Sequence, residues 1–195
     1  FITGMCSSFN FPRTRNVFGE VFTDLTQMYV TKINANASAI VYSTNLRQTN
    51  NPSFGTILPN NGPRAFPGAT NPLGEGAGAK PAGIAVDSRG NAYITGNLRP
   101  AYIFPIPAAA PQQPSSQTFP SIPLTSDALD SAWTTPVAPE AATTEGFLIV
   151  LNPTATGLVH GSYIGSYYDD VVMAPYVDAF GDVWVYGRSS NGHSY

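Results

Sequence analysis

Side chains capable of nucleophilic or acid–base chemistry are few in this 195-residue chain, which has one cysteine and two histidines. A catalytic thiol needs a neighbouring histidine as its base and a third group that orients that base. His160 and His193 fall at unrelated places in the sequence, so the pattern predicts no cysteine–histidine site. Cys6 has no second cysteine for a disulfide within the chain. We therefore expect Cys6 to be a small, buried or half-buried packing residue.

Carboxylates offer a second kind of chemistry. Asp87 and the adjacent pair Asp169 and Asp170 have the hard oxygen atoms that Ca²⁺ prefers, but such a site needs about six oxygens. Acidic residues in turns more often accept hydrogen bonds from backbone N–H groups. Glu140 and Glu145 have no acidic partner at a repeat-related position, which argues against a paired-carboxylate glycosidase. The sequence therefore predicts no catalytic residue, no bound metal and no cofactor.

Two further patterns concern binding. The triplet from Asn36 to Ser38 fits an N-glycosylation acceptor at an expected hairpin tip. A set of aromatic residues fits either a carbohydrate-binding surface or packing between sheets, and strand alternation favours packing. The set is Tyr163, Tyr167, Tyr168, Tyr176, Trp184 and Tyr186.

Composition limits the classes of partner. Charged residues make up 11% of the chain and the net charge is −3, with no basic stripe to follow a phosphate backbone, so nucleic acid is excluded. No apolar run approaches the roughly 20 residues that cross a bilayer. The polar but uncharged composition is typical of secreted bacterial proteins. Phe1 stands inside a strand pattern, so we expect the natural chain to begin upstream.

Internal repetition determines the architecture. Three similar strands end in Gly4, Gly96 and Gly187, which are 92 and then 91 residues apart. A second element also recurs, since the run ending in Asn34 resembles the run ending in Asn152. Repeats at a fixed period indicate a protein built from successive copies of one supersecondary unit.

Each repeat reads as two hairpins. Alternating apolar residues flank an expected turn at 87–91, and the same pattern recurs around 178–182. Both turns contain Asp, which can accept hydrogen bonds from the turn backbone, and Gly, which can adopt a positive φ. A second pair of β-rich runs flanks 34–38 and returns around 152–157. The segments between hairpins are long and rich in proline and glycine, and only 125–133 has the pattern of a short helical turn. We predict an all-β chain with four-stranded antiparallel blades.

These motifs resemble the bacterial β-propeller repeat called SBBP. The resemblance rests on the order of an apolar-Val-Asp-x-x-Gly-Asn-Ala-Tyr-Ile-Thr-Gly hairpin, a Phe-Pro pair, a strand ending in Asn, and a Val-Tyr-Ser-Thr strand. The matching segments are 84–96, 11–12, 29–34, 40–46, 147–153, 161–166 and 169–178. The resemblance covers the strands and fails across 50–81 and 98–142, which read as insertions peculiar to this chain.

The repeats give about two blades' worth of strands spread over one propeller segment, 1–195. We expect the latter part of one blade at 1–46, an insertion at 47–82, a full blade at 83–164 with an insertion at 98–142, and the opening hairpin of a third blade at 171–188. A propeller closes with four to eight blades. The expected partners are therefore further blades of the same longer chain, or neighbouring copies that form a homo-oligomeric ring or a filament.

The resemblance implies a secreted or cell-surface bacterial protein without general catalytic residues. The function that we expect is non-catalytic and extracellular: a structural or binding module that serves adhesion or assembly through its long loops. Two alternatives stay open. One is a propeller that binds a glycan, a protein or another ligand, and the other is a propeller hydrolase, which suffers because no acid, base and nucleophile converge in corresponding loops.

Overall fold

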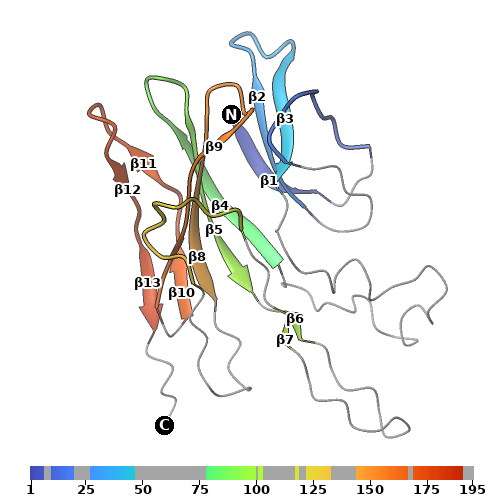
Figure 1. Cartoon of the computed structure of the whole chain (residues 1–195). Coiled ribbons are helices and arrows are strands. Elements are labelled where there is room, and N and C mark those ends of the chain that lie inside the picture. Colours follow the sequence, from blue (N-terminus) through green and yellow to red (C-terminus); the bar gives the residue numbers. More distant parts are fainter. Residues whose placement is uncertain are drawn as a thin grey trace, which may run out of the picture.

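A computed structural model describes residues 1–6, 10–19, 27–46, 78–99, 101–102, 117–118, 122–132, 144–166 and 169–190. Within these ranges the chain is all-β and contains no helix, as predicted. It follows that no helix of the described part is long and apolar enough to cross a membrane. The strands group into three units that lie side by side in chain order (Figure 1).

The first unit is a three-stranded antiparallel sheet in the order β1-β2-β3. Its strands are β1 (Ile2–Cys6), β2 (Gln27–Ile33) and β3 (Ile40–Leu46). Gly4 lies opposite Tyr29, and a Cβ at Gly4 would meet the tyrosine ring. The unit spans the segment expected to be the latter part of a blade, and it is here called blade 1.

The second unit, blade 2, is the four-stranded antiparallel sheet that the repeat predicts, in the order β4-β5-β8-β9. Its strands are β4 (Gly78–Val86), β5 (Ala92–Arg99), β8 (Glu145–Leu151) and β9 (Leu158–Ile164). Gly96 lies opposite Phe147 and leaves room for its ring, as Gly4 does for Tyr29 in blade 1. A separate short pair, β6 (Ala101–Tyr102) and β7 (Gln117–Thr118), lies within the long connection between β5 and β8.

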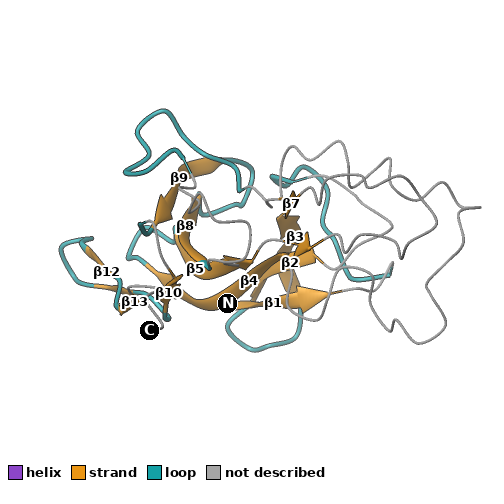
Figure 2. Ribbon diagram, turned by 90° about the horizontal axis from the view of Figure 1, so that it is seen from below, coloured by secondary structure: helices purple, strands orange, loops and turns teal. Residues whose placement is uncertain are grey.

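The third unit, blade 3, consists of two short antiparallel pairs, β10 with β13 and β11 with β12. The strands are β10 (Asp169–Val172), β11 (Tyr176–Val177), β12 (Val183–Trp184) and β13 (Gly187–Ser190). They repeat the β4–β5 hairpin of blade 2. Figure 2 shows the same three units from below, with blade 2 between the other two.

Two sequence boundaries were wrong. β4 begins at Gly78, so residues 78–82 belong to a strand and not to the insertion expected over 47–82. Proline has no backbone N–H and is disfavoured in a central strand. β4 is however the edge strand of its sheet, and a register shift between Pro81 and Gly83 accommodates the proline. β5 likewise extends to Arg99, past the expected start of the second insertion at 98.

The helical turn expected over 125–133 is also absent from its described part, 125–132. The segment makes a single turn closed by the Ala128 N–H, which donates to the Thr125 carbonyl at 3.1 Å. It continues as an extended strap along β9, held by Thr125 and Asp130. Hydrogen bonds to a neighbouring strand edge have replaced those of a helix.

The hydrophobic core lies between blades 1 and 2. Alternate residues of the central strands β5 and β8 are fully buried there, as period-2 alternation requires. Blade 1 contributes residues of β2 and β3 to the same cluster. The core residues are Met28, Val30, Tyr42, Leu46, Ala79, Ala92, Ile94, Leu98, Ile122, Phe147, Ile149, Leu151, Ala155 and Tyr163.

Candidate functional site

The Asp87 and Asp178 turns are structural. Asp87 Oδ1 accepts the backbone N–H groups of Arg89 and Asn91 at 2.9 and 2.8 Å, and its Oδ2 accepts the Asn91 amide and the Tyr93 hydroxyl. Desolvation opposes ionisation, but these hydrogen bonds, led by that of the Asn91 side chain, lower the pKa of Asp87. Both carboxylate oxygens of Asp87 thus accept hydrogen bonds within the turn, which is a structural role.

Asp178 repeats this geometry in blade 3. Its Oδ1 accepts the N–H groups of Phe180 and Asp182, both at 2.9 Å, and its Oδ2 accepts the Trp184 indole N–H at 3.1 Å. The hydrogen bond from Trp184 is the main cause of the lowered pKa of Asp178. Gly181 completes the turn with a φ of 93°, in the left-handed region that glycine adopts readily.

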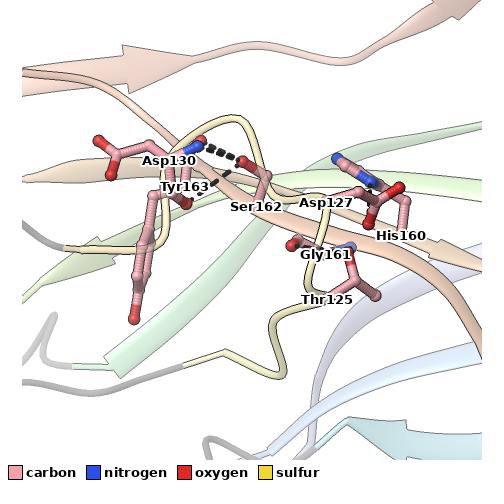
Figure 3. Close-up of polar contacts among 7 residues, drawn as sticks. All are labelled: Thr125, Asp127, Asp130, His160, Gly161, Ser162 and Tyr163. Carbon is pink, nitrogen blue, oxygen red and sulfur yellow. Dashed lines mark hydrogen bonds and ion pairs between the residues drawn. The ribbon is translucent and has the colours of Figure 1, made fainter.

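His160 does not form a catalytic triad. Figure 3 shows His160 beside Asp127, with 3.5 Å between Nδ1 and Oδ1, and Ser162 farther along the same strand. The Ser162 hydroxyl accepts the Asp130 N–H at 3.0 Å and donates to the Tyr163 carbonyl at 2.8 Å. A buried hydroxyl that is bound to backbone on both sides is not placed for nucleophilic attack.

Ser162 instead lies on β9 and binds Asp130 of the strap, a feature that the sequence analysis missed. The Thr125 N–H donates to the Gly161 carbonyl at 3.1 Å, and the Gly161 N–H donates to Thr125 Oγ1 at 3.2 Å (Figure 3). In blade 1 the Thr14 N–H donates to the Ser43 carbonyl at 3.0 Å, and the Ser43 N–H donates to Thr14 Oγ1 at 3.1 Å. A loop thus covers the outer edge of β3 and of β9 in the same way. The signal in the sequence is a Pro-x-Thr triplet, at 12–14 and again at 123–125.

An acidic site lies where blade 2 meets blade 3. Glu145, at the start of β8, is only 1% exposed, and Asp170, in β10, is 6% exposed. A Cβ at Gly165 would collide with Glu145 Oε1 and would lie 2.9 Å from Asp170 Oδ2, so both carboxylates point at this glycine. The sequence pattern excluded only acidic partners at repeat-related positions, and Asp170 becomes a neighbour of Glu145 through packing between blades.

Burial governs the ionisation of Glu145. Desolvation first, and then the negative charges of Asp170 and Asp130, raise the pKa of Glu145 to about 8. Asp170 Oδ2 accepts hydrogen bonds from the N–H and the hydroxyl of Ser166, whereas Glu145 Oε1 has no hydrogen-bond partner. The two acids therefore form a buried pair in which one carboxylate oxygen, Glu145 Oε1, has no hydrogen-bond partner.

The neighbouring Asp169 has a different role from Asp170. Its Oδ1 accepts the Thr144 N–H at 2.7 Å, while the Asp170 N–H donates to the Thr144 carbonyl at 2.8 Å. These bonds fasten β10 to the start of β8. Across the described ranges, no three His, Cys, Asp or Glu side chains are placed together to hold a metal ion.

Aromatic residues of blade 3 form an exposed face. Tyr176 and Trp184 are cross-strand partners, and their exposed fractions are 63% and 62%, while Tyr186 is 67% exposed. Tyr163, which the sequence grouped with them, is buried in the core. Tyr167 and Tyr168 lie outside the described residues. The set is therefore divided between packing and an open surface.

The remaining sequence candidates are scattered. Cys6 is half-buried at the end of β1, and Asn36 is exposed at the β2–β3 hairpin tip, where the Ser38 hydroxyl donates to its Oδ1 at 2.7 Å. His193 and Glu140 lie outside the described residues. Cys6 and Asn36 both belong to blade 1 and not to the acidic site between blades 2 and 3.

One of the repeated hairpins is similar to a known protein family. Residues 73–97 match the family model of the SBBP β-propeller repeat. The match covers β4 and most of β5 of blade 2, where the Asp87 turn and Gly96 lie. No curated protein and no solved structure matches the chain. The matched part is thus the first hairpin of the four-stranded antiparallel sheet, and the described strands do not form a closed ring of blades.

Proposed function

We propose that this chain is a non-catalytic propeller module of a secreted or cell-surface bacterial protein, which works by packing against further blades. The observation that carries the proposal is the exposed aromatic face of blade 3. Isolated apolar side chains on a surface need no explanation, but a contiguous group of them is typical of an interaction site. The SBBP match at 73–97 supports a repeat whose units pack against one another.

Blade 2 shows how such a face is covered within this chain. The Thr95 hydroxyl donates to the Met173 carbonyl at 2.7 Å, and the Asn97 side chain makes two hydrogen bonds with the backbone of Val172, at 3.0 and 2.8 Å. β10 of blade 3 therefore lies across β5 of blade 2, and Thr95 is fully buried.

The corresponding face of blade 3 has no such cover among the described residues. By the spacing of the repeat, Trp184 corresponds to Tyr93, and Tyr186 corresponds to Thr95. Trp184 and Tyr186 are largely exposed, while Thr95 is completely buried. The partner that we propose is another blade of the same kind, either farther along a longer chain or in a neighbouring copy, which would give a ring or a filament.

The test is the association state of the purified chain. Analytical ultracentrifugation and negative-stain imaging should show assemblies, and Trp184→Ser together with Tyr186→Ser should dissolve them. Phe180→Ser is the matched control, because Phe180 is 94% exposed at the hairpin tip, away from the paired strands. A monomeric wild-type chain would refute association between copies and leave blades of the same longer chain as the partner.

A second candidate function is carbohydrate binding by the same face. It is favoured by the exposed, cross-strand Tyr176 and Trp184, because flat aromatic rings stack on sugars. The two candidates differ in a glycan-array experiment with the wild-type chain. Binding that is lost in Trp184→Ala supports the carbohydrate function, and binding that survives this substitution excludes the aromatic face as its site.

A further inference from the structure

Two buried carboxylates form the acidic site at the junction of blades 2 and 3. Glu145 comes from β8, Asp170 from β10, and Gly165 from the segment that follows β9. Both carboxylates point at Gly165, where a side chain would not fit. The geometry thus joins two acids from two blades beneath a residue that has no side chain.

Among the described residues, no positive side chain compensates these acids. The charged groups that act on Glu145 are Asp170 and Asp130, and both are negative. No Lys, Arg or His within the described ranges forms an ion pair with Glu145 or Asp170. Glu145 Oε1 is buried without a hydrogen-bond partner, which is costly for a carboxylate.

The equivalent junction between blades 1 and 2 is a natural comparison. Asn34 recurs as Asn152, 118 residues on, and this spacing places Gln27 at the position of Glu145 and Arg47 at the position of Gly165. Asp87 recurs as Asp178, 91 residues on, which places Ala79 at the position of Asp170. The repeat therefore has a neutral amide, an arginine and an alanine in one copy, and two acids with a glycine in the other.

We propose that Glu145 and Asp170 bind a hard divalent cation, Ca²⁺ in particular, that bridges blades 2 and 3. Ca²⁺ accepts carboxylate, hydroxyl and water oxygens in irregular arrangements, whereas Mg²⁺ demands a near-octahedral set. Only two carboxylates contribute, so hydroxyl, backbone or water oxygens complete the coordination. We expect an affinity at the weak end for protein calcium sites, with a Kd of about 0.1–1 mM. This site is independent of the aromatic face and of the function proposed above.

The test is Ca²⁺-dependent stability of the whole chain, measured by thermal unfolding and isothermal titration calorimetry after treatment with EDTA. CaCl₂ should raise the unfolding temperature of the wild-type chain and saturate as a single site. Glu145→Gln and Asp170→Asn should each abolish the Ca²⁺-dependent shift, whatever their own stability. Asp182→Asn, at an exposed turn position, is the matched control and should keep the shift.

Three results would overturn the proposal. The first is a wild-type unfolding temperature that Ca²⁺ does not change, which would mean that a proton on Glu145 neutralises the site. The second is an equal shift in the wild-type chain and in both site variants. The third is an equal shift with NaCl at matched ionic strength, because general screening of surface charge would then account for it.

Discussion

The strap over β9 makes a quantitative prediction. Thr125→Val keeps the shape of the side chain but removes the hydroxyl that accepts the Gly161 N–H at 3.2 Å. Gly161 is buried, so its N–H is left without a partner, at a cost of about 1–3 kcal/mol. For a chain of this size, each kcal/mol corresponds to a decrease of about 2–4 °C in Tm. The backbone bond from the Thr125 N–H to the Gly161 carbonyl remains.

Hydrogen exchange measured residue by residue by NMR, together with chemical denaturation, tests this prediction. The Gly161 amide should exchange about 5-fold to 100-fold faster, since 1.4 kcal/mol corresponds to a factor of ten. The Ile149 amide, in the centre of the sheet, should change only by the global loss of stability. Thr125→Ser retains a hydroxyl and is the matched control. The reasoning fails if Thr125→Val and Thr125→Ser give the same Gly161 exchange rate.

Two further predictions concern the turns and the close contacts of the blades. Hydrogen bonds to the ionised carboxylate lower the pKa of Asp178, so their contribution to the stability of the turn is present above pH 4 and is lost as the pH falls through the lowered pKa. The NMR chemical shift of the Trp184 indole N–H should therefore titrate in that acid range, and it should stay constant in Asp178→Asn. Gly96→Ala should strongly lower the denaturation midpoint, because its Cβ would collide with the Phe147 ring and the Lys80 carbonyl oxygen. Gly157→Ala is the control and should have little effect, because its Cβ would have one neighbour, at 3.3 Å. Equal midpoints for the two variants would contradict the tight packing at Gly96.

Local features of the fold could be predicted from the sequence. Alternation and the Asp-to-Gly turns correctly predicted the β4–β5 hairpin and its copy in blade 3, since these depend on residues only a few positions apart. The four-stranded order of blade 2 followed from joining two hairpins. The start of β4 at Gly78 was missed because the segment before Gly83 is rich in glycine and has the pattern of a loop; that Pro81 fits a strand there depends on the edge position of β4, which only the assembled sheet decides.

The acidic site was beyond the reach of sequence patterns. Glu145 and Asp170 lie on different blades, and their convergence depends on how β10 packs against β8. Packing between blades also determines which of the aromatic residues are buried and which are exposed. Tyr163 and Trp184 are both strand residues of a similar type, but one faces the core between blades and the other faces outward. Burial of this kind depends on which neighbour covers a sheet.

Thr14 and Thr125 anchor a loop to the edge strand of blade 1 and of blade 2. Because of these anchors, the length of the connection before each threonine does not alter how the loop binds the blade. The segment from Cys6 to Thr14 is short and the one from Arg99 to Thr125 is long, yet both end in the same pair of backbone and hydroxyl bonds. Loop-closure entropy grows with the logarithm of length, so the longer tether costs only about 1 kcal/mol more. Evolution can therefore lengthen the chain ahead of each anchor at little cost, and this gives the repeat a place where sequence can vary while the blade is conserved in form.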